Sequence, residues 1–274
     1  MSVLDSYFNI FNEGADDNKH RQHAVDVYER IFEALGGDLK GKFKQSPGTS
    51  NSVTVNIGEL IGDKDLENLN LRFVEGSTRA QSDTEKSVGS NFRAKASFKG
   101  SVIGGKHSIQ LHVPGAGFTQ DPIGWKKFVE KNAKSMFKRF ENGFFIHEFI
   151  HYVDFLRIHP DDIEKKSKAF YKSKKGNKSY YNDPLELNAY IQQGLGRLEH
   201  HLRSLTGKHP EGSSGQRVEK LKVRALIGKS PNEFYTKVLS VLPEGFAENL
   251  TDANKNKLKK RAAQMWTDTM KRFK

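Results

Sequence analysis

The 274-residue chain contains no cysteine. This absence excludes disulfide bonds, thiolate metal sites and cysteine nucleophiles. The chain also lacks an apolar run of the length that a membrane span needs. Its first residues, MSVLDSYFNIFNEGADDN, are acidic and lack the basic start and apolar core of a secretory signal. We therefore expect no membrane span and a cytoplasmic protein.

Positive charge is in excess, with 45 Lys and Arg against 33 Asp and Glu and a net charge of +12. The basic residues gather at 164–178, where the segment EKKSKAFYKSKKGNK holds seven lysines, and at 251–274. Such an excess of positive charge is typical of proteins that bind nucleic acids, anionic membranes or acidic proteins, and it also favours solubility. No aromatic-interleaved strand or nucleic-acid motif accompanies the charge, so the partner stays open.

Hydrophobic periodicity predicts a helix, then short strands, then mostly helices. The predicted strands span residues 51–60, 69–76, 92–100 and 106–115. The predicted helices span residues 17–35, about 122–140, about 144–158, a lysine-rich segment after 161, 183–205, 230–242 and 251–273. This order predicts an α+β fold with a small mixed sheet in an N-terminal lobe and a mostly helical C-terminal lobe. We expect a single domain over 1–274, divided into parts at 1–121, 122–205 and 206–274, with the helix at 144–158 between the lobes.

The segment HEFIH, residues 147–151, matches the pattern H-E-x-x-H on a predicted helix. His147 and His151 are four residues apart and share one helical face, so both imidazoles can reach one metal ion. Glu148 is rotated off that axis, where it can take a proton from a metal-bound water. The alternative is a surface helix with polar residues on every turn. The apolar flanks favour a buried helix, in which a metal supplies the partners that buried His and Glu need.

A catalytic zinc has three protein ligands, so the sequence must supply one more. Glu186, in YYNDPLELNAYIQQ, stands in the first turn of a predicted helix and is the favoured third ligand. Asp183 is the second choice. His159 ranks lower because it lies eight residues beyond His151. The competing interpretation is that Asp183 and Glu186 form a capping box, with Glu186 reaching back to the backbone.

Residues 154 and 157 decide two further points. A metzincin would have glycine and histidine there, whereas this chain has Asp154 and Arg157, so that class is excluded. Asp154 can accept a hydrogen bond from a ring nitrogen of His147 or His151, or it can pair with Arg157.

A residue that stabilises the oxyanion is also expected. The candidates for that role are Tyr180, Tyr181, Tyr190, His200 and His201.

HEFIH on a buried helix, followed by a helix with Glu186-x-x-Ala189, resembles the glutamate-ligand (gluzincin) branch of the zincin metallopeptidases. HEFIHYVD and NDPLELNAY are also similar to zincin-like proteins of tailed bacteriophages. The resemblance covers about residues 106–195. It implies a zincin-like fold, zinc ligands at His147, His151 and Glu186, Glu148 as general base, and a strand at 106–113 that pairs with an extended substrate. The gap from His151 to Glu186 is longer than in the thermolysin-like members.

Two functions follow as hypotheses. The first is a zinc-dependent metallopeptidase that hydrolyses protein or peptide substrates, in which Glu148 activates the zinc-bound water and then protonates the leaving amine. The second is a catalytically inactive zincin-like binding protein. Its basic segments at 164–178 and 251–274 would dock to nucleic acid or to an acidic assembly partner, such as a virion component in a host cell.

Overall fold

The α+β class predicted from the sequence is confirmed by a computed structural model, in which helices accompany one mixed sheet. The chain divides into two compact units. The sheet unit is Asp26–Phe170, and the helical unit is Met1–Val25 together with Tyr171–Lys274. The described residues are 14–45, 52–76, 95–99, 106–114, 121–138, 143–157, 177–210 and 212–272. The predicted lysine-rich helix after residue 161 and His159 lie outside these ranges.

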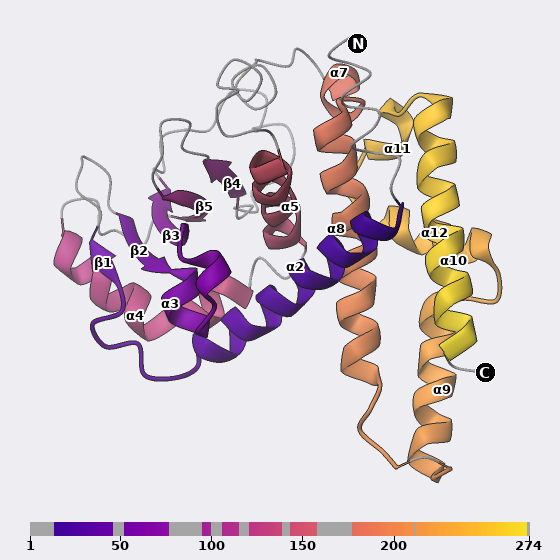
Figure 1. The fold of residues 1–274 in the computed structure, drawn as a ribbon, viewed down its shortest axis with the longest axis horizontal. Helices are drawn as coiled ribbons and strands as arrows, with labels where there is room; N and C mark the ends of the chain where they lie inside the picture. Colours follow the sequence, from indigo (N-terminus) through magenta and orange to yellow (C-terminus); the bar gives the residue numbers. More distant parts are fainter. Residues whose placement is uncertain are drawn as a thin grey trace. The chain divides into compact units, whose positions relative to one another are not determined.

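A five-stranded sheet of order β1-β2-β3-β5-β4 forms the centre of the sheet unit (Figure 1). β3 and β5 are parallel, and the other neighbouring strands are antiparallel. The strands are β1 (Lys44–Gln45), β2 (Ser52–Asn56), β3 (Leu69–Gly76), β4 (Lys95–Lys99) and β5 (His107–Pro114). The strand predicted at 106–113 is therefore β5, which pairs on both sides. Its predicted role as a substrate-binding edge strand is wrong, because β3 and β4 already occupy its hydrogen-bonding groups.

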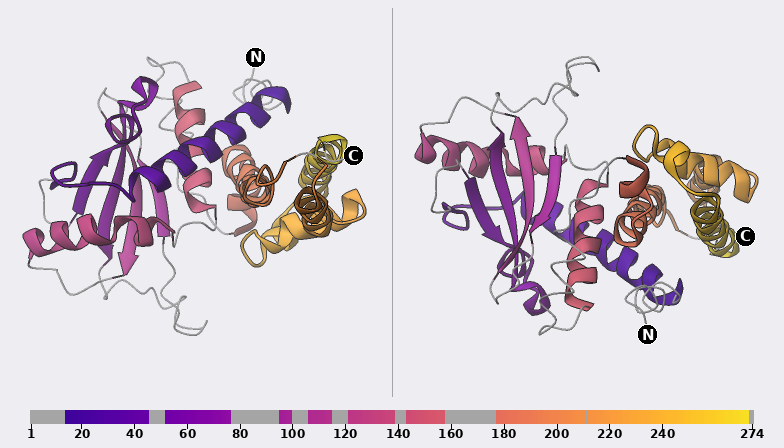
Figure 2. Two further views of the ribbon diagram at one scale, coloured as in Figure 1. Left: turned by 90° about the horizontal axis from the view of Figure 1, so that it is seen from below. Right: turned by 90° about the horizontal axis from the view of Figure 1, so that it is seen from above.

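The core of the sheet unit lies between strands and helices. Side chains along β2, β3 and β5 point alternately to the two faces of the sheet, and one of these faces buries a set of apolar side chains. This set comprises Val53, Val55, Leu69, Leu71, Phe73, Ile109, Leu111 and Val113. Helix α4 (Pro122–Lys138) packs against β2, and helix α5 (Phe144–Arg157) packs against β4 and β5 (Figure 2). The ring centroids of Tyr28, Phe137 and Phe145 lie 4.9–6.0 Å from one another, so α2 (Gly14–Ala34), α4 and α5 share one aromatic cluster.

One predicted strand, 51–60, is two elements. β2 ends at Asn56, whose side-chain oxygen accepts a hydrogen bond of 2.9 Å from the Glu59 amide and begins helix α3 (Ile57–Ile61). Gly62, with a φ of 68°, then ends α3, and a short 3-10 helix, η1 (Lys64–Leu66), follows. The prediction failed because Asn56 acts as an N-cap inside a continuous run of buried residues.

The helical unit is built around α8 (Pro184–Leu205), and its elements bury one continuous apolar core. The other helices described in this unit are the first part of α2, α7 (Asn177–Tyr181), α9 (Ser214–Ile227), α10 (Pro231–Ser240), α11 (Phe246–Asn249) and α12 (Asp252–Arg272). Neither α7 nor α9 was predicted: α7 follows a polar, lysine-rich segment that is typical of a loop, and on α9 the exposed Val218 and Leu221 obscure the apolar stripe of a helix. Gly194 allows α10 to approach α8 closely, because a Cβ there would lie 3.1 Å from Val238 and 3.2 Å from Leu242. Among the described helices, none has the length and apolar composition that a membrane crossing requires.

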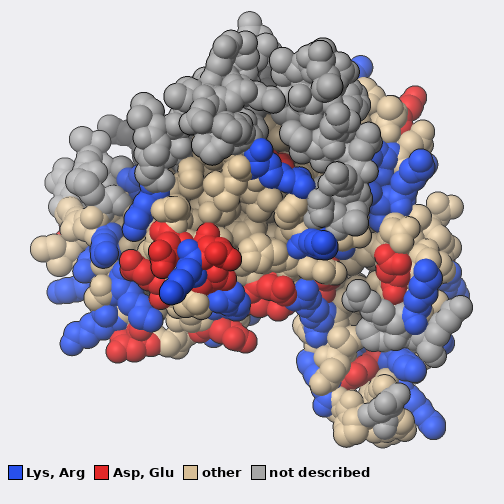
Figure 3. Space-filling model, viewed as in Figure 1, with Lys and Arg blue, Asp and Glu red and all other residues tan. Residues whose placement is uncertain are grey.

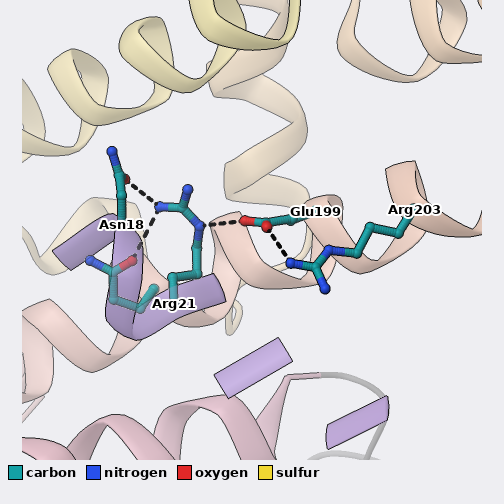
Figure 4. Close-up of polar contacts among 5 residues, drawn as sticks. Asn18, Arg21, Glu199 and Arg203 are labelled. Carbon is teal, nitrogen blue, oxygen red and sulfur yellow. Dashed lines mark hydrogen bonds and ion pairs between the residues drawn. The ribbon is translucent and has the colours of Figure 1, made fainter. Parts of the chain in front are cut away.

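A buried ionic network ties α2 to α8 within the helical unit (Figure 4). The Arg21 guanidinium donates to Glu199 and to Asn18, both at 2.9 Å, and to Gln192 at 3.4 Å. Glu199 also accepts a hydrogen bond of 3.0 Å from Arg203 on its own helix. The Glu199 charge is thus shared between two guanidinium groups, which offsets the desolvation of a buried carboxylate.

Candidate metal centre

Helix α5 carries the HEFIH segment and is buried almost all round. Ten of its 14 residues are buried, including His147, Glu148 and His151. The helix starts after Gly143, which has a φ of 86°, and the His147 amide donates to the Gly143 carbonyl at 2.9 Å. The predicted burial of this helix is confirmed. An exposed helix with polar residues on every turn is therefore excluded.

The two histidines of α5 point their Nε2 atoms at each other. These atoms are 3.1 Å apart, and the two rings are nearly perpendicular, with an interplanar angle of 85°. Two nitrogen lone pairs that face each other at this distance repel, so a proton or a cation must lie between them. Two imidazole ligands of one tetrahedral zinc, each about 2.0–2.1 Å from the ion, would be separated by about 3.3 Å. The observed spacing fits two ligands of a single metal ion.

Glu186 belongs to the same group. His147, His151 and Glu186 each offer one ligand atom, these atoms all lie within 4.8 Å of one another, and all three residues are buried. Within the described ranges, this is the one group of three or more His, Cys, Asp or Glu side chains arranged so. Catalytic metal sites that keep one coordination position open can be built from two imidazoles and one carboxylate. The buried triad could hold a metal ion.

The start of α8 separates the roles of Asp183 and Glu186. Asp183 is the N-cap, and its carboxylate accepts hydrogen bonds from the amides of Leu185 at 3.1 Å and of Glu186 at 3.4 Å. The Asp183 amide donates to the Tyr180 carbonyl at 3.2 Å. The backbone group that Glu186 would reach in a capping box therefore already has an acceptor. This arrangement assigns the cap to Asp183 and makes Glu186 available to a metal.

Two further predicted residues lie on α5. Glu148 directly follows His147 and is buried. Asp154 is buried as well, and its Oδ1 is 4.0 Å from Nη1 of Arg157. The ion pair considered for Asp154 is thus present. The hydrogen bond from a histidine ring N–H to the Asp154 carboxylate, and the role of Glu148 as a base, remain predictions.

The tyrosines proposed for the oxyanion gather beside Glu186. Tyr180, Tyr181 and Tyr190 pack edge-on against one another with ring centroids 5.3–6.2 Å apart. The Tyr180 hydroxyl is hydrogen-bonded to the side chains of Glu186 and Tyr190. Burial, followed by Tyr190 and Glu186, raises the pKa of Tyr180 far above its ordinary value, so this hydroxyl keeps its proton. No sequence spacing indicates this contact, because the turn at Asn182 separates α7 from α8.

The remaining candidates lie further along α8. His200 is half-buried and His201 is exposed, and neither belongs to the metal-binding group found among the described residues. Comparisons with protein-family models, with curated proteins and with solved structures found no match for the chain.

Proposed function

We propose that the protein is a zinc-dependent metallopeptidase with a zincin-like fold. In this proposal His147, His151 and Glu186 bind the zinc, and Glu148 is the general base. The observation that supports it is the buried group of two imidazoles and one carboxylate on converging ligand atoms. Structural zinc sites use four protein ligands, whereas catalytic sites use three and leave room for water and substrate. The three-ligand group favours a catalytic centre.

The donor set favours zinc over the other common divalent ions. Imidazole nitrogens suit Zn²⁺, whereas Ca²⁺ and Mg²⁺ prefer oxygen ligands alone. Zinc bound there would lower the pKa of a water molecule and polarise a peptide carbonyl. The hydrolytic chemistry then depends on how the protein moves protons and holds the substrate.

Glu148 would move the proton. Its carboxylate accepts a proton from the attacking water and donates it to the nitrogen of the leaving amine. Glu148 is buried on the same helix as both histidines, one residue after His147.

Strand β4 would hold the substrate. Among the described strands it pairs only with β5, so its outer edge carries backbone donors and acceptors that an extended peptide can use. β4 also packs against α5, the helix of His147 and His151. The zincin resemblance implied that β5 binds the substrate as an edge strand. We assign this role to β4 instead.

The zinc content of the purified protein tests the proposed metal site. We expect about one equivalent of zinc in the purified wild-type protein and its loss in His147→Ala. His201→Ala is the matched control, because His201 is an exposed histidine on α8 and is not part of the metal-binding group. A wild-type protein without bound metal after zinc reconstitution would overturn the proposal.

Cleavage of a peptide library tests the proposed role of Glu148 as the general base. Glu148→Gln keeps the shape of the side chain and removes its basicity, so we expect normal zinc content and a loss of cleavage of at least about 100-fold. Glu244→Gln, at an exposed position, should cleave like the wild type. Full turnover by Glu148→Gln would refute the assignment of the base.

A second function, polyanion binding, is favoured by the charge distribution. Residues 206–274 contain 15 Lys and Arg against 7 Asp and Glu, a net charge of +8 out of the chain's +12. Lys259, Lys260 and Lys271 of α12 are exposed, and Figure 3 shows basic side chains over α12 and at the lower end of α9. The other basic segment, 164–178, lies mostly outside the described residues.

We propose nucleic acid as the partner of this surface, with an acidic assembly protein as the alternative. Fluorescence anisotropy with labelled duplex DNA tests this. Counterion release predicts that the affinity falls steeply between about 50 and 200 mM salt. Lys259→Gln/Lys260→Gln should weaken the binding, and no binding at low salt would exclude nucleic acid.

A further inference from the structure

The Tyr180 hydroxyl connects two side chains of α8. It is hydrogen-bonded to the Glu186 carboxylate and to the Tyr190 hydroxyl. An ionised carboxylate only accepts hydrogen bonds, and a tyrosine hydroxyl has one proton. The Tyr180 hydroxyl is therefore the donor in its bond with Glu186, and a donated bond of this kind keeps the proton on Tyr180, in line with its raised pKa.

Aromatic packing holds the Tyr180 ring in place. Its centroid is 5.5 Å from that of Tyr181 and 6.2 Å from that of Tyr190, with interplanar angles of 64° and 76°. Tyr181 and Tyr190 in turn lie 5.2 Å and 5.1 Å from Phe246 of α11. Edge-to-face contacts of this kind are favourable beyond the area that they bury. The hydroxyl is thus fixed by a cluster of rings rather than by one contact.

The backbone that carries Tyr180 is fixed as well. Asn182, in the turn between α7 and α8, donates to the Asn249 and Lys178 carbonyls, both at 2.7 Å. Its side-chain oxygen accepts from the Thr251 amide at 2.9 Å and from the Asn254 side chain at 2.8 Å. The Asn182 amide therefore uses both donor hydrogens and accepts twice, which anchors the turn to the ends of α11 and α12.

We propose that Tyr180 is a positioning residue, whose hydroxyl holds the Glu186 carboxylate in the orientation that binds the metal. This inference rests on the proposed metal site. A hydrogen bond to a ligating carboxylate fixes its rotamer before the ion arrives, so less conformational freedom is lost on binding. Tyr190 supports this arrangement through Tyr180, one bond further away.

Metal affinity of three variants tests the inference. Tyr180→Phe keeps the ring and removes the donor, and Tyr181→Phe is the matched control from the same aromatic cluster. Affinity is measured by competition with a chromophoric chelator, and the ligand geometry by the visible absorption of the Co²⁺-loaded protein. We expect Tyr180→Phe to bind zinc about 10-fold to 100-fold more weakly and to change the Co²⁺ spectrum. Tyr181→Phe should stay within about twofold of the wild type, and Tyr190→Phe should show a loss smaller than that of Tyr180→Phe.

The outcomes separate this inference from the metal site itself. If the wild type binds one equivalent and Tyr180→Phe binds it equally tightly with an unchanged Co²⁺ spectrum, the inference fails and the proposed function stands. If Tyr180→Phe lowers only the thermal stability of the metal-free protein, the role of Tyr180 is structural and the inference fails too. A wild-type protein that binds no metal overturns the proposed function and this inference together.

Discussion

Replacement of Arg21 by methionine removes one of the two guanidinium groups that neutralise Glu199 (Figure 4). The Arg21 side chain is 5% exposed and that of Glu199 12%, so the pair is removed from water. Arg203 contacts the same carboxylate at nearly the same distance, 3.0 Å against 2.9 Å, but its side chain is 35% exposed. The two arginines therefore differ mainly in burial.

This difference sets the expected free energies of unfolding. Loss of one partner from a buried ion pair costs about 3 kcal/mol, because the remaining charge keeps its desolvation penalty. Loss of a partly exposed pair costs about 0.5 kcal/mol. We expect Arg21→Met to lose about 3 kcal/mol and Arg203→Met about 0.5 kcal/mol. Arg21→Met/Glu199→Met should recover most of the larger loss, since no buried carboxylate is left.

Urea unfolding followed by helical circular dichroism measures all three variants and the wild type under one set of conditions. The prediction depends on the order of the losses as well as on their size. Equal losses for Arg21→Met and Arg203→Met would refute the argument from burial. A double variant less stable than Arg21→Met would show that Glu199 is held by other groups.

Three other changes have defined outcomes. Asn182→Ala removes four hydrogen bonds from the turn before α8 and should lower the unfolding free energy by about 2 kcal/mol, measured in urea. Gly194→Val forces side-chain atoms against Val238 and Leu242, already 3.1–3.3 Å from a Cβ, and should lower it by about 2 kcal/mol, seen as a reduced melting temperature. The raised pKa of Tyr180 means that its contribution to stability is complete below about pH 10, the value for an unfolded tyrosine, and is lost as the pH rises further. Melting temperatures from pH 8 to 11 should therefore fall less steeply for Tyr180→Phe than for the wild type.

Helix starts with local caps could be predicted from the sequence. The Asp121 carboxylate accepts a 2.8 Å hydrogen bond from the Gly124 amide at the start of α4, and its position directly before Pro122 is a sequence signal for such a cap. Ser230 accepts from the Glu233 amide at 3.2 Å at the start of α10. Such caps use atoms within four residues of one another, so the signal is complete in a short window.

Elements that depend on distant contacts could not be predicted. α9 begins with a Ser213 cap, but Val218 and Leu221 are exposed on it, which blurs the apolar stripe that would have revealed the helix. α7 has only five residues, and its end is fixed by bonds from Asn182 to segments about 70 residues later. The edge-strand prediction for residues 106–113 failed for the same reason, because β4 precedes β5 in sequence but lies outside it in the sheet.

The candidate site also combines features that the sequence could predict with features that it could not. His147 and His151 share one helix, so their spacing alone predicted that they converge, and the Nε2 separation of 3.1 Å confirms this. Glu186 comes from a different helix, and the sequence left it between a cap and a ligand. In the structure the Asp183 amide donates to the Tyr180 carbonyl, which disfavours the capping bond from Glu186, and the role of Glu186 as a metal ligand stays a prediction. The Tyr180 hydrogen bond to Glu186 had no sequence signal.

The two outer strands of the sheet have a consequence for solubility. β1 has two residues and β4 has five, and lysines stand at the start of β1 and at both ends of β4. Short, positively charged edges disfavour the pairing of one sheet with another copy of itself. An edge that binds an extended peptide cannot be covered by another strand, so its short length and positive charge are what limit pairing between copies. Neutralising Lys44, which is exposed on β1, should therefore promote self-association through the β1 edge of the sheet.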